Sequence, residues 1–147
     1  MDGELSSDLE VVLNQYQNIL THVIRISKNQ GLGKALSKAI KTFQNEYDYF
    51  IRFDTDDINL PNRAEFLINF INLNNPDLVS SSMYEFGEFK EKVRSVSAKP
   101  IALKSFAFTN PIFHPASAFQ IKKVLSIGCF EHMPAFEDWL CWMKLAK

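Results

Sequence analysis

The sequence has little of several features that mark particular classes of protein. Its 147 residues contain two cysteines, Cys129 and Cys141, too few for a disulfide framework, so we expect a reduced, cytoplasmic setting. Sixteen basic and seventeen acidic residues give a formal net charge of −1. A general nucleic-acid-binding protein would show a basic excess, so no nucleic-acid partner is expected. No apolar run approaches the roughly 18 residues of a membrane span, and the acidic start is unlike a secretory signal.

Apolar residues, in contrast, are plentiful and regularly placed. Hydrophobic residues make up 46% of the chain, and 13 phenylalanines supply material for a core. We find no internal repeat, linker or low-complexity tract. We therefore expect a single domain over residues 1–147.

Segments with helical spacing alternate with β-branched segments. The expected helices cover residues 7–16, 32–43, 61–73 and 135–147, with a further short one over 101–108. The expected strands cover residues 22–27, 49–53, 77–83 and 116–121. The charged stretch 85–99 predicts a hairpin or a loop. This alternation predicts an α/β fold with a mostly parallel sheet flanked by helices.

Three carboxylates, those of Asp54, Asp56 and Asp57, follow the expected strand over 49–53. Side chains this close repel one another unless a cation or solvent relieves them. Ligands of open α/β sheets bind at this end of the strands, and Mg²⁺ is commonly held by one or two carboxylates plus substrate phosphates. The segment therefore indicates a metal site. The alternative is a polar loop that caps the next helix.

A glycine-containing turn, Asn29-Gln30-Gly31-Leu32-Gly33-Lys34, opens the second expected helix. Backbone N–H groups and the helix dipole favour a phosphate at such a place, and Lys34 would add a positive charge. The stretch is not a P-loop, because no glycine stands five residues before Gly33. A plain turn that starts a helix remains the alternative.

A third candidate lies at the start of the last expected helix, at Phe136-Glu137-Asp138-Trp139. A carboxylate beside aromatic side chains can have a raised pKa and act as a general base. Acidic residues in a first helical turn also stabilise the helix dipole, which is the alternative.

The order of these motifs resembles that of the family 2 glycosyltransferases, which are inverting enzymes with the GT-A fold. The similar segments are Asp2-Gly3, Asn29-X-Gly31-Leu32, Arg52-X-Asp54-X-Asp56-Asp57 with Pro61 and Arg63, residues 110–115, and Glu137-Asp138-Trp139. Members of this family begin with a strand, a helix and a second strand before the Asp-Gly, and they continue past the last helix. The sequence therefore resembles the middle of such an enzyme.

The resemblance implies a binding site for a nucleotide diphosphate sugar donor. Asp56 would bind Mg²⁺ or Mn²⁺ directly, and Asp54 would contact the ribose or assist the metal. Asp2 would hydrogen-bond the nucleoside. Gly31, with Asn29, and Lys34 would lie on the diphosphate side of the donor. The sugar would pass to a hydroxyl acceptor, either a sugar or a lipid-linked glycan, with inversion.

The resemblance also implies a catalytic base and a setting. Asp138 would take the proton of the acceptor, with Glu137 as the reserve for that role. Arg52 and Arg63 would position the acidic loop. Surface polysaccharide or lipopolysaccharide synthesis is the expected setting, with peripheral membrane contact and a homo-oligomer covering the incomplete sheet as further expectations.

Three alternatives stand beside this interpretation. A non-catalytic remnant or binding module would keep the fold without a complete donor site. A phosphatase of the haloacid dehalogenase type also uses Asp-X-Asp, but it needs Thr or Val where this chain has Ile58. A Ca²⁺ loop of the EF-hand type fails, because the glycine at its sixth position is missing.

Overall fold

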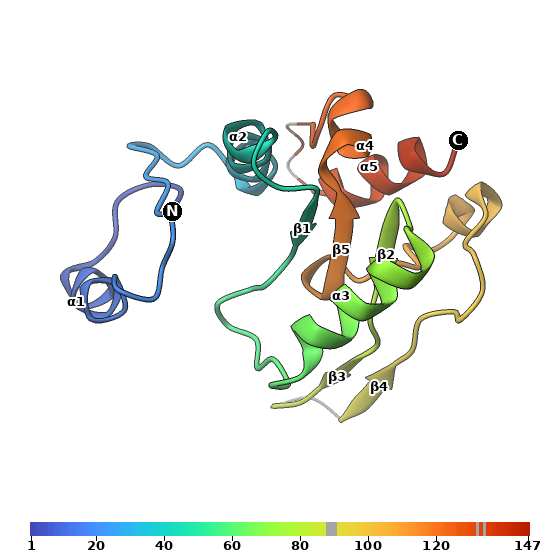
Figure 1. Ribbon diagram of the computed structural model, residues 1–147, viewed down its shortest axis with the longest axis horizontal. Helices are drawn as coiled ribbons and strands as arrows, with labels where there is room; N and C mark the ends of the chain where they lie inside the picture. Colours follow the sequence, from blue (N-terminus) through green and yellow to red (C-terminus); the bar gives the residue numbers. More distant parts are fainter. Residues whose placement is uncertain (88–90, 132, 134) are drawn as a thin grey trace.

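A three-stranded sheet lies at the centre of the computed structural model, which describes residues 1–87, 91–131, 133 and 135–147 (Figure 1). Its strands are β1 (Tyr49–Ile51), β2 (Leu78–Ser80) and β5 (Ser117–Gln120), in the order β1-β5-β2. β5 pairs antiparallel with both neighbours, so that Ile51 and Val79 face Ala118 from opposite sides. β5 is therefore the central strand.

The expected predominance of parallel pairing is not confirmed. β1 and β2 run in the same direction and are joined through helix α3 (Arg63–Asn74), but β5 lies between them. The connection through α3 leaves a gap of one strand between β1 and β2. β5 enters this gap from the end of the sheet at which β1 and β2 finish, so it runs antiparallel to both. In the described part of the chain, the parallel contact is an isolated bridge between Asp2 and Ile26.

The main core lies on one face of this sheet, under helices α2 (Leu32–Phe43), α4 (Ile121–Ser126) and α5 (Glu137–Leu145). Phe119 on β5 and Trp142 on α5 have no solvent exposure, and their ring centroids are 5.6 Å apart. Helix α3 covers the opposite face, where Leu67 and Ile71 pack on Ala118. Adjacent residues of β5 thus serve two cores, as the two-residue period of a strand requires.

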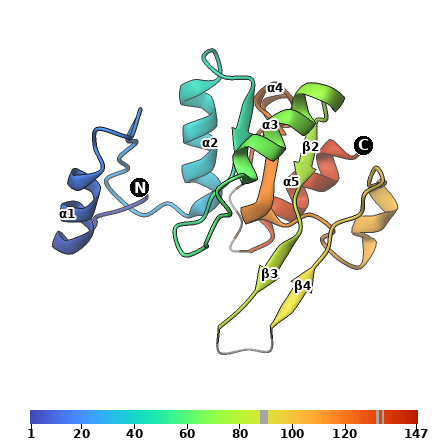
Figure 2. The same ribbon diagram turned by 60° about the horizontal axis from the view of Figure 1, so that its bottom comes forward.

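The expected helices over 7–16, 32–43, 61–73 and 135–147 are confirmed, with ends within two residues of those observed. The short helix expected over 101–108 is the 3₁₀ helix η1 (Leu103–Ala107), and a second 3₁₀ turn, η2 (His114–Ala116), precedes β5. The expected hairpin consists of β3 (Met83–Glu85) and β4 (Lys92–Arg94) and projects from the body (Figure 2). Its residues 88–90 lie outside the described part of the chain.

The expected strand over 22–27 is wrong. The segment forms a single bridge at Ile26, held by backbone hydrogen bonds to Met1 and Gly3 of 3.0 Å each. A strand needs successive pairs along a ladder, and among the described residues this segment makes one bridge. Helix α1 (Ser7–Gln15) completes this N-terminal unit, and the ion pair of Glu10 with Arg25 (2.7 Å) ties the helix to the bridge.

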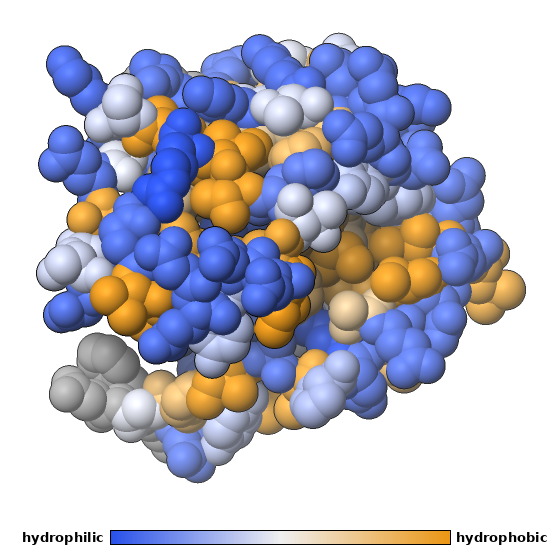
Figure 3. Space-filling model, turned by 60° about the vertical axis from the view of Figure 1, so that its left-hand side comes forward, coloured by the Kyte–Doolittle hydropathy of each residue, from blue (hydrophilic) through white to orange (hydrophobic). Residues whose placement is uncertain are grey.

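Helix α1 has no buried residue, and its apolar side chains face solvent. The exposed ones on the helix are Leu9, Val11 and Val12, each about half accessible. The corresponding face of the molecule shows apolar patches between polar ones (Figure 3). No helix in the described residues is both long enough and apolar enough to cross a membrane.

Candidate functional site

The acidic loop after β1 is anchored by a buried arginine. Asp54 forms an ion pair with Arg52, which is 7% exposed and also donates a hydrogen bond from Nη1 to the carbonyl of Phe53 (2.9 Å). Asp56 and Asp57 lie beyond this anchor and are exposed to solvent. The loop therefore has one carboxylate fixed to the body and two that point into solvent.

Arg63, at the start of α3, fixes the same loop from the other side. Its Nη1 donates to the carbonyl of Arg52 (3.0 Å) and to Oδ1 of Asn59 (2.7 Å), and its Nη2 donates to the carbonyl of Pro115 (3.1 Å). The guanidinium also lies over the Phe53 ring, 4.6 Å from its centroid. Both arginines thus position the loop, in the way expected for them from the sequence.

His114, in η2, packs against α5. Its ring stacks on Phe130 and lies edge-on to Trp142, with centroids 5.3 and 5.7 Å away. Burial, with a further contribution from the charge of Arg52, lowers the pKa of His114 to about 3. The imidazole is therefore neutral at physiological pH and packs as a buried aromatic ring against Phe130 and Trp142.

The start of α2 carries a carboxylate where a phosphate was expected. Asp2 accepts hydrogen bonds from the backbone N–H groups of Gln30 (2.8 and 3.0 Å) and Gly31 (2.8 Å), and Asn29 Oδ1 also accepts from Gly31 (3.0 Å). Gly31 has a φ of 88°, which favours glycine. A carboxylate is a suitable partner for a helix N-terminus, so Asp2 orders this turn. Lys34 is exposed one turn further on.

The candidate base at the start of α5 is held by an asparagine. Asn110 Nδ2 donates to Oδ2 of Asp138 (2.8 Å), while Asn110 Oδ1 accepts from the N–H of Ile112 (3.2 Å). Asp138 is half-buried, and its other carboxylate oxygen has no hydrogen bond in the described part of the structure. The sequence did not link Asn110 with Asp138, because the contact spans 28 residues and no local pattern signals it.

A close approach brings the starts of α2 and α5 together. A Cβ added at Gly33 would lie 2.8 Å from the carbonyl oxygen of Glu131 and 3.5 Å from Cγ of Glu137. Only glycine allows this contact without a shift of the neighbouring backbone. The beginnings of both helices and the loop after β1 face the same side of the molecule (Figure 2).

The structure thus joins the sequence candidates at two places. Asp54 pairs with Arg52, and the backbone of Gly33 lies close to the side chain of Glu137. Among the described residues, no three or more His, Cys, Asp and Glu side chains gather as a metal site. Asp54 and Asp56 still match the chemistry of Mg²⁺ or Mn²⁺, since Mg²⁺ takes one or two protein carboxylates beside phosphates and water.

Gly33→Ala tests the contact between α2 and α5. Overpacking against the backbone of Glu131 costs roughly 1–3 kcal/mol, which should exceed the helix propensity gain of at most about 1 kcal/mol. We expect a lower midpoint of urea unfolding, with Lys38→Ala, at an exposed position of the same helix, close to wild type. A Gly33→Ala variant as stable as wild type would contradict the close approach.

The depressed pKa of His114 predicts an acid-dependent loss of stability. The unfolded chain, with a His pKa near 6.5, binds a proton that the folded state takes up only near pH 3. The free energy of unfolding should therefore fall as pH decreases from about 6.5 toward 3. Urea titrations should show a shallower decrease for His114→Gln than for wild type. Equal slopes for the two proteins would contradict the burial of a neutral imidazole.

Comparison with known proteins gives evidence about the family of this chain that is independent of the geometry. The chain is 32% identical to the UDP-Gal:alpha-D-GlcNAc-diphosphoundecaprenol beta-1,3-galactosyltransferase of Escherichia coli, over 97% of this chain and 53% of that protein. It is 34% identical to the amylovoran biosynthesis glycosyltransferase AmsE of Erwinia amylovora, over 98% of this chain and 55% of that protein. The chain therefore spans about half the length of these relatives. No solved structure matches it.

The family model described as Glycosyl transferase family 2 matches residues 2–139, which include all the candidate segments from Asp2 to Asp138. This family implies a GT-A-like α/β fold, and a sheet covered by helices on both faces agrees with it. The chain belongs to glycosyl transferase family 2.

Proposed function

We propose that this chain forms part of an enzyme that transfers a sugar from a nucleotide diphosphate sugar to a hydroxyl acceptor with inversion. The observation that carries the proposal is the family match over residues 2–139, in which the anchored acidic loop and the held Asp138 both lie. A match of this length does not favour the alternative of a non-catalytic remnant. The names of the relatives support bacterial surface polysaccharide synthesis as the setting.

The acceptor, in this proposal, is a sugar linked to a lipid through a diphosphate. The name of the Escherichia coli relative gives such an acceptor, GlcNAc-diphosphoundecaprenol, for that protein. A lipid-linked acceptor resides at a membrane surface, so the enzyme would work at the cytoplasmic face with peripheral membrane contact.

On the donor side, we assign metal binding to Asp56 and Asp54. Mg²⁺ or Mn²⁺, when bound there, supplies Lewis-acid neutralisation of the charge that develops on the departing diphosphate. The ion pair with Arg52 keeps Asp54 in place, while the exposed Asp56 is open to a ligand. Asp2 already accepts three backbone hydrogen bonds, which favours a role in ordering the start of α2 over direct contact with the nucleoside.

On the acceptor side, we assign the general base to Asp138. The hydrogen bond from Asn110 fixes one carboxylate oxygen and leaves the other to accept the proton of the attacking hydroxyl. Attack from the face opposite the leaving group inverts the anomeric centre. The side chain of Glu137 lies against Gly33, which makes Glu137 the second choice.

Asp56→Ala should remove metal-dependent donor binding. We expect the affinity for UDP in the presence of Mn²⁺ to fall at least ten-fold, about 1.4 kcal/mol, because a direct carboxylate ligand is lost. Isothermal titration of the full-length protein with and without Mn²⁺ measures this. Asp57→Ala, which removes the same charge from the same exposed loop, serves as the control. Unchanged Mn²⁺-dependent binding of UDP in Asp56→Ala would contradict the assignment of Asp56 as a metal ligand.

Asp138→Asn should separate catalysis from binding. Turnover of donor and acceptor should fall by about 10²-fold or more, the usual contribution of a general base, while donor affinity stays within about two-fold. Glu137→Gln, one residue earlier in the same helical turn, should keep much more of the turnover. Near-normal turnover in Asp138→Asn would exclude it as the base.

A further inference from the structure

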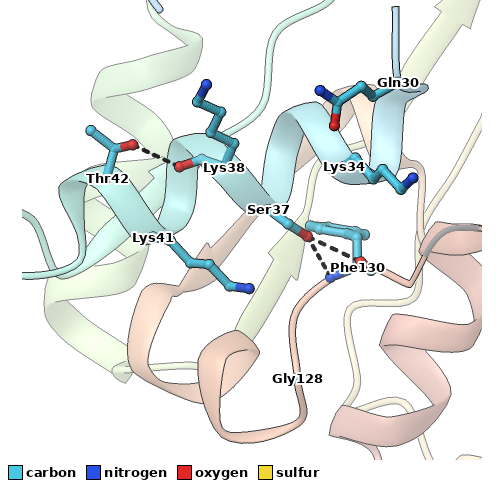
Figure 4. A pocket seen from close by; sticks show the side chains of 8 residues that line it. All are labelled: Gln30, Lys34, Ser37, Lys38, Lys41, Thr42, Gly128 and Phe130. Carbon is cyan, nitrogen blue, oxygen red and sulfur yellow. Dashed lines mark hydrogen bonds between the residues drawn. The ribbon is translucent and has the colours of Figure 1, made fainter. Parts of the chain in front are cut away.

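A hollow of about 540 Å³ lies along the outer side of α2 (Figure 4). We call it the lysine groove. One wall is α2, and the other is the segment Gly128–Phe130 that follows α4. The groove is lined by Lys34, Lys38, Lys41, Ser37, Gly128 and Phe130, with Gln30 and Thr42 at its two ends. The residues assigned to donor binding and to the general base do not include Lys38 or Lys41.

The two walls of the lysine groove are fastened to each other. Ser37 Oγ donates to the carbonyl of Phe130 (3.0 Å) and accepts from its N–H (3.1 Å). The other wall turns at Gly128, which has a φ of 92° and follows the end of α4. The N–H of Gly128 donates to the carbonyl of Leu125 (3.0 Å), and the N–H of Cys129 donates to the carbonyl of Val124 (2.9 Å). The shape of the groove is therefore fixed by the fold.

The lysine groove carries three positive charges on one side of α2. Lys34, Lys38 and Lys41 recur at intervals of four and three residues, so they occupy successive turns of one side of α2 and repel one another. In the described structure none of the three forms an ion pair, whereas Lys144 pairs with Glu131 beside the groove. The nearby Asp2 carboxylate is bonded to the N–H groups at the start of α2.

The orientation of the lysines suits a ligand with more than one phosphate. Lys41 extends toward the Gly128–Phe130 wall, Lys34 lies at the other end, and Lys38 projects from the rim (Figure 4). A lysine ammonium binds phosphate as a point charge, without the fixed geometry of a guanidinium. Three such charges along one groove attract a polyanion more strongly than they attract a ligand with a single carboxylate.

We propose that the lysine groove binds the diphosphate group of the lipid-linked acceptor, an inference that rests on the proposed function. The donor diphosphate is assigned to the metal at Asp54 and Asp56, which leaves these lysines for a second anionic substrate. The groove begins at Lys34, next to Gly33, whose contact with Glu137 leads to the candidate base. An acceptor held by its diphosphate in the groove would thus present its sugar near Asp138.

The test measures diphosphate binding without turnover. Isothermal titration of the full-length protein with inorganic diphosphate and with geranyl diphosphate, both without metal, should give saturable binding. Lys38→Gln/Lys41→Gln should weaken both by roughly ten-fold, about three-fold for each exposed lysine. The control Lys92→Gln/Lys99→Gln removes the same charge from exposed positions in and after β4 and should change neither affinity by more than about two-fold.

Several results would overturn the proposal: no binding to wild type, unchanged binding in Lys38→Gln/Lys41→Gln, or an equal loss in the control. An equal loss of UDP binding with Mn²⁺ would assign the groove to the donor instead. An equal loss of binding to anionic vesicles that lack diphosphate lipid would assign it to the membrane surface. The proposed function fails separately, through absent Mn²⁺-dependent UDP binding or absent turnover in wild type.

Discussion

The pairing of β5 with both β1 and β2 is the constraint on which the rest of the structure depends. β5 is short, but Ala118 and Phe119 have no solvent exposure, and each anchors a different core. The first residue of β5 and the turn before it bring the loop after β1 into place. The carbonyl of Ser117 accepts from the N–H of Arg52 (2.9 Å), and the carbonyl of Pro115 accepts from Arg63. A change in the register of β5 would displace the acidic loop together with the core.

Some carboxylates of the candidate site are held by hydrogen bonds or ion pairs, and others are exposed to solvent. Asp2, Asp54 and Asp138 are each held by a defined partner, while Asp56 is exposed. Held carboxylates keep one geometry and leave few groups to reorganise when a substrate binds, which is the condition for electrostatic catalysis. In the proposed enzyme the free charges, Asp56 and the lysine groove, are the ones that meet metal and phosphate.

Much of this could be predicted from the sequence. Helical spacing located α1, α2, α3 and α5, and the run of acidic residues after β1 indicated the candidate metal loop. Long-range contacts could not be predicted. The segment 22–27 has a strand-like pattern but makes a single bridge among the described residues, and the antiparallel sense of β5 depends on the end from which the chain enters the sheet. Neither property is local to the sequence.

The sequence by itself determined which residues could act: the carboxylates of Asp54, Asp56 and Asp138, and an α/β succession of helices and strands. The tertiary structure decided their partners. Asn110 meets Asp138 across 28 residues, and Ser37 meets Phe130 across 93, because helices packed on one face of a sheet bring distant segments into contact. Periodicity reports which face of an element is apolar, whereas the partner of that face is fixed only when the whole core packs.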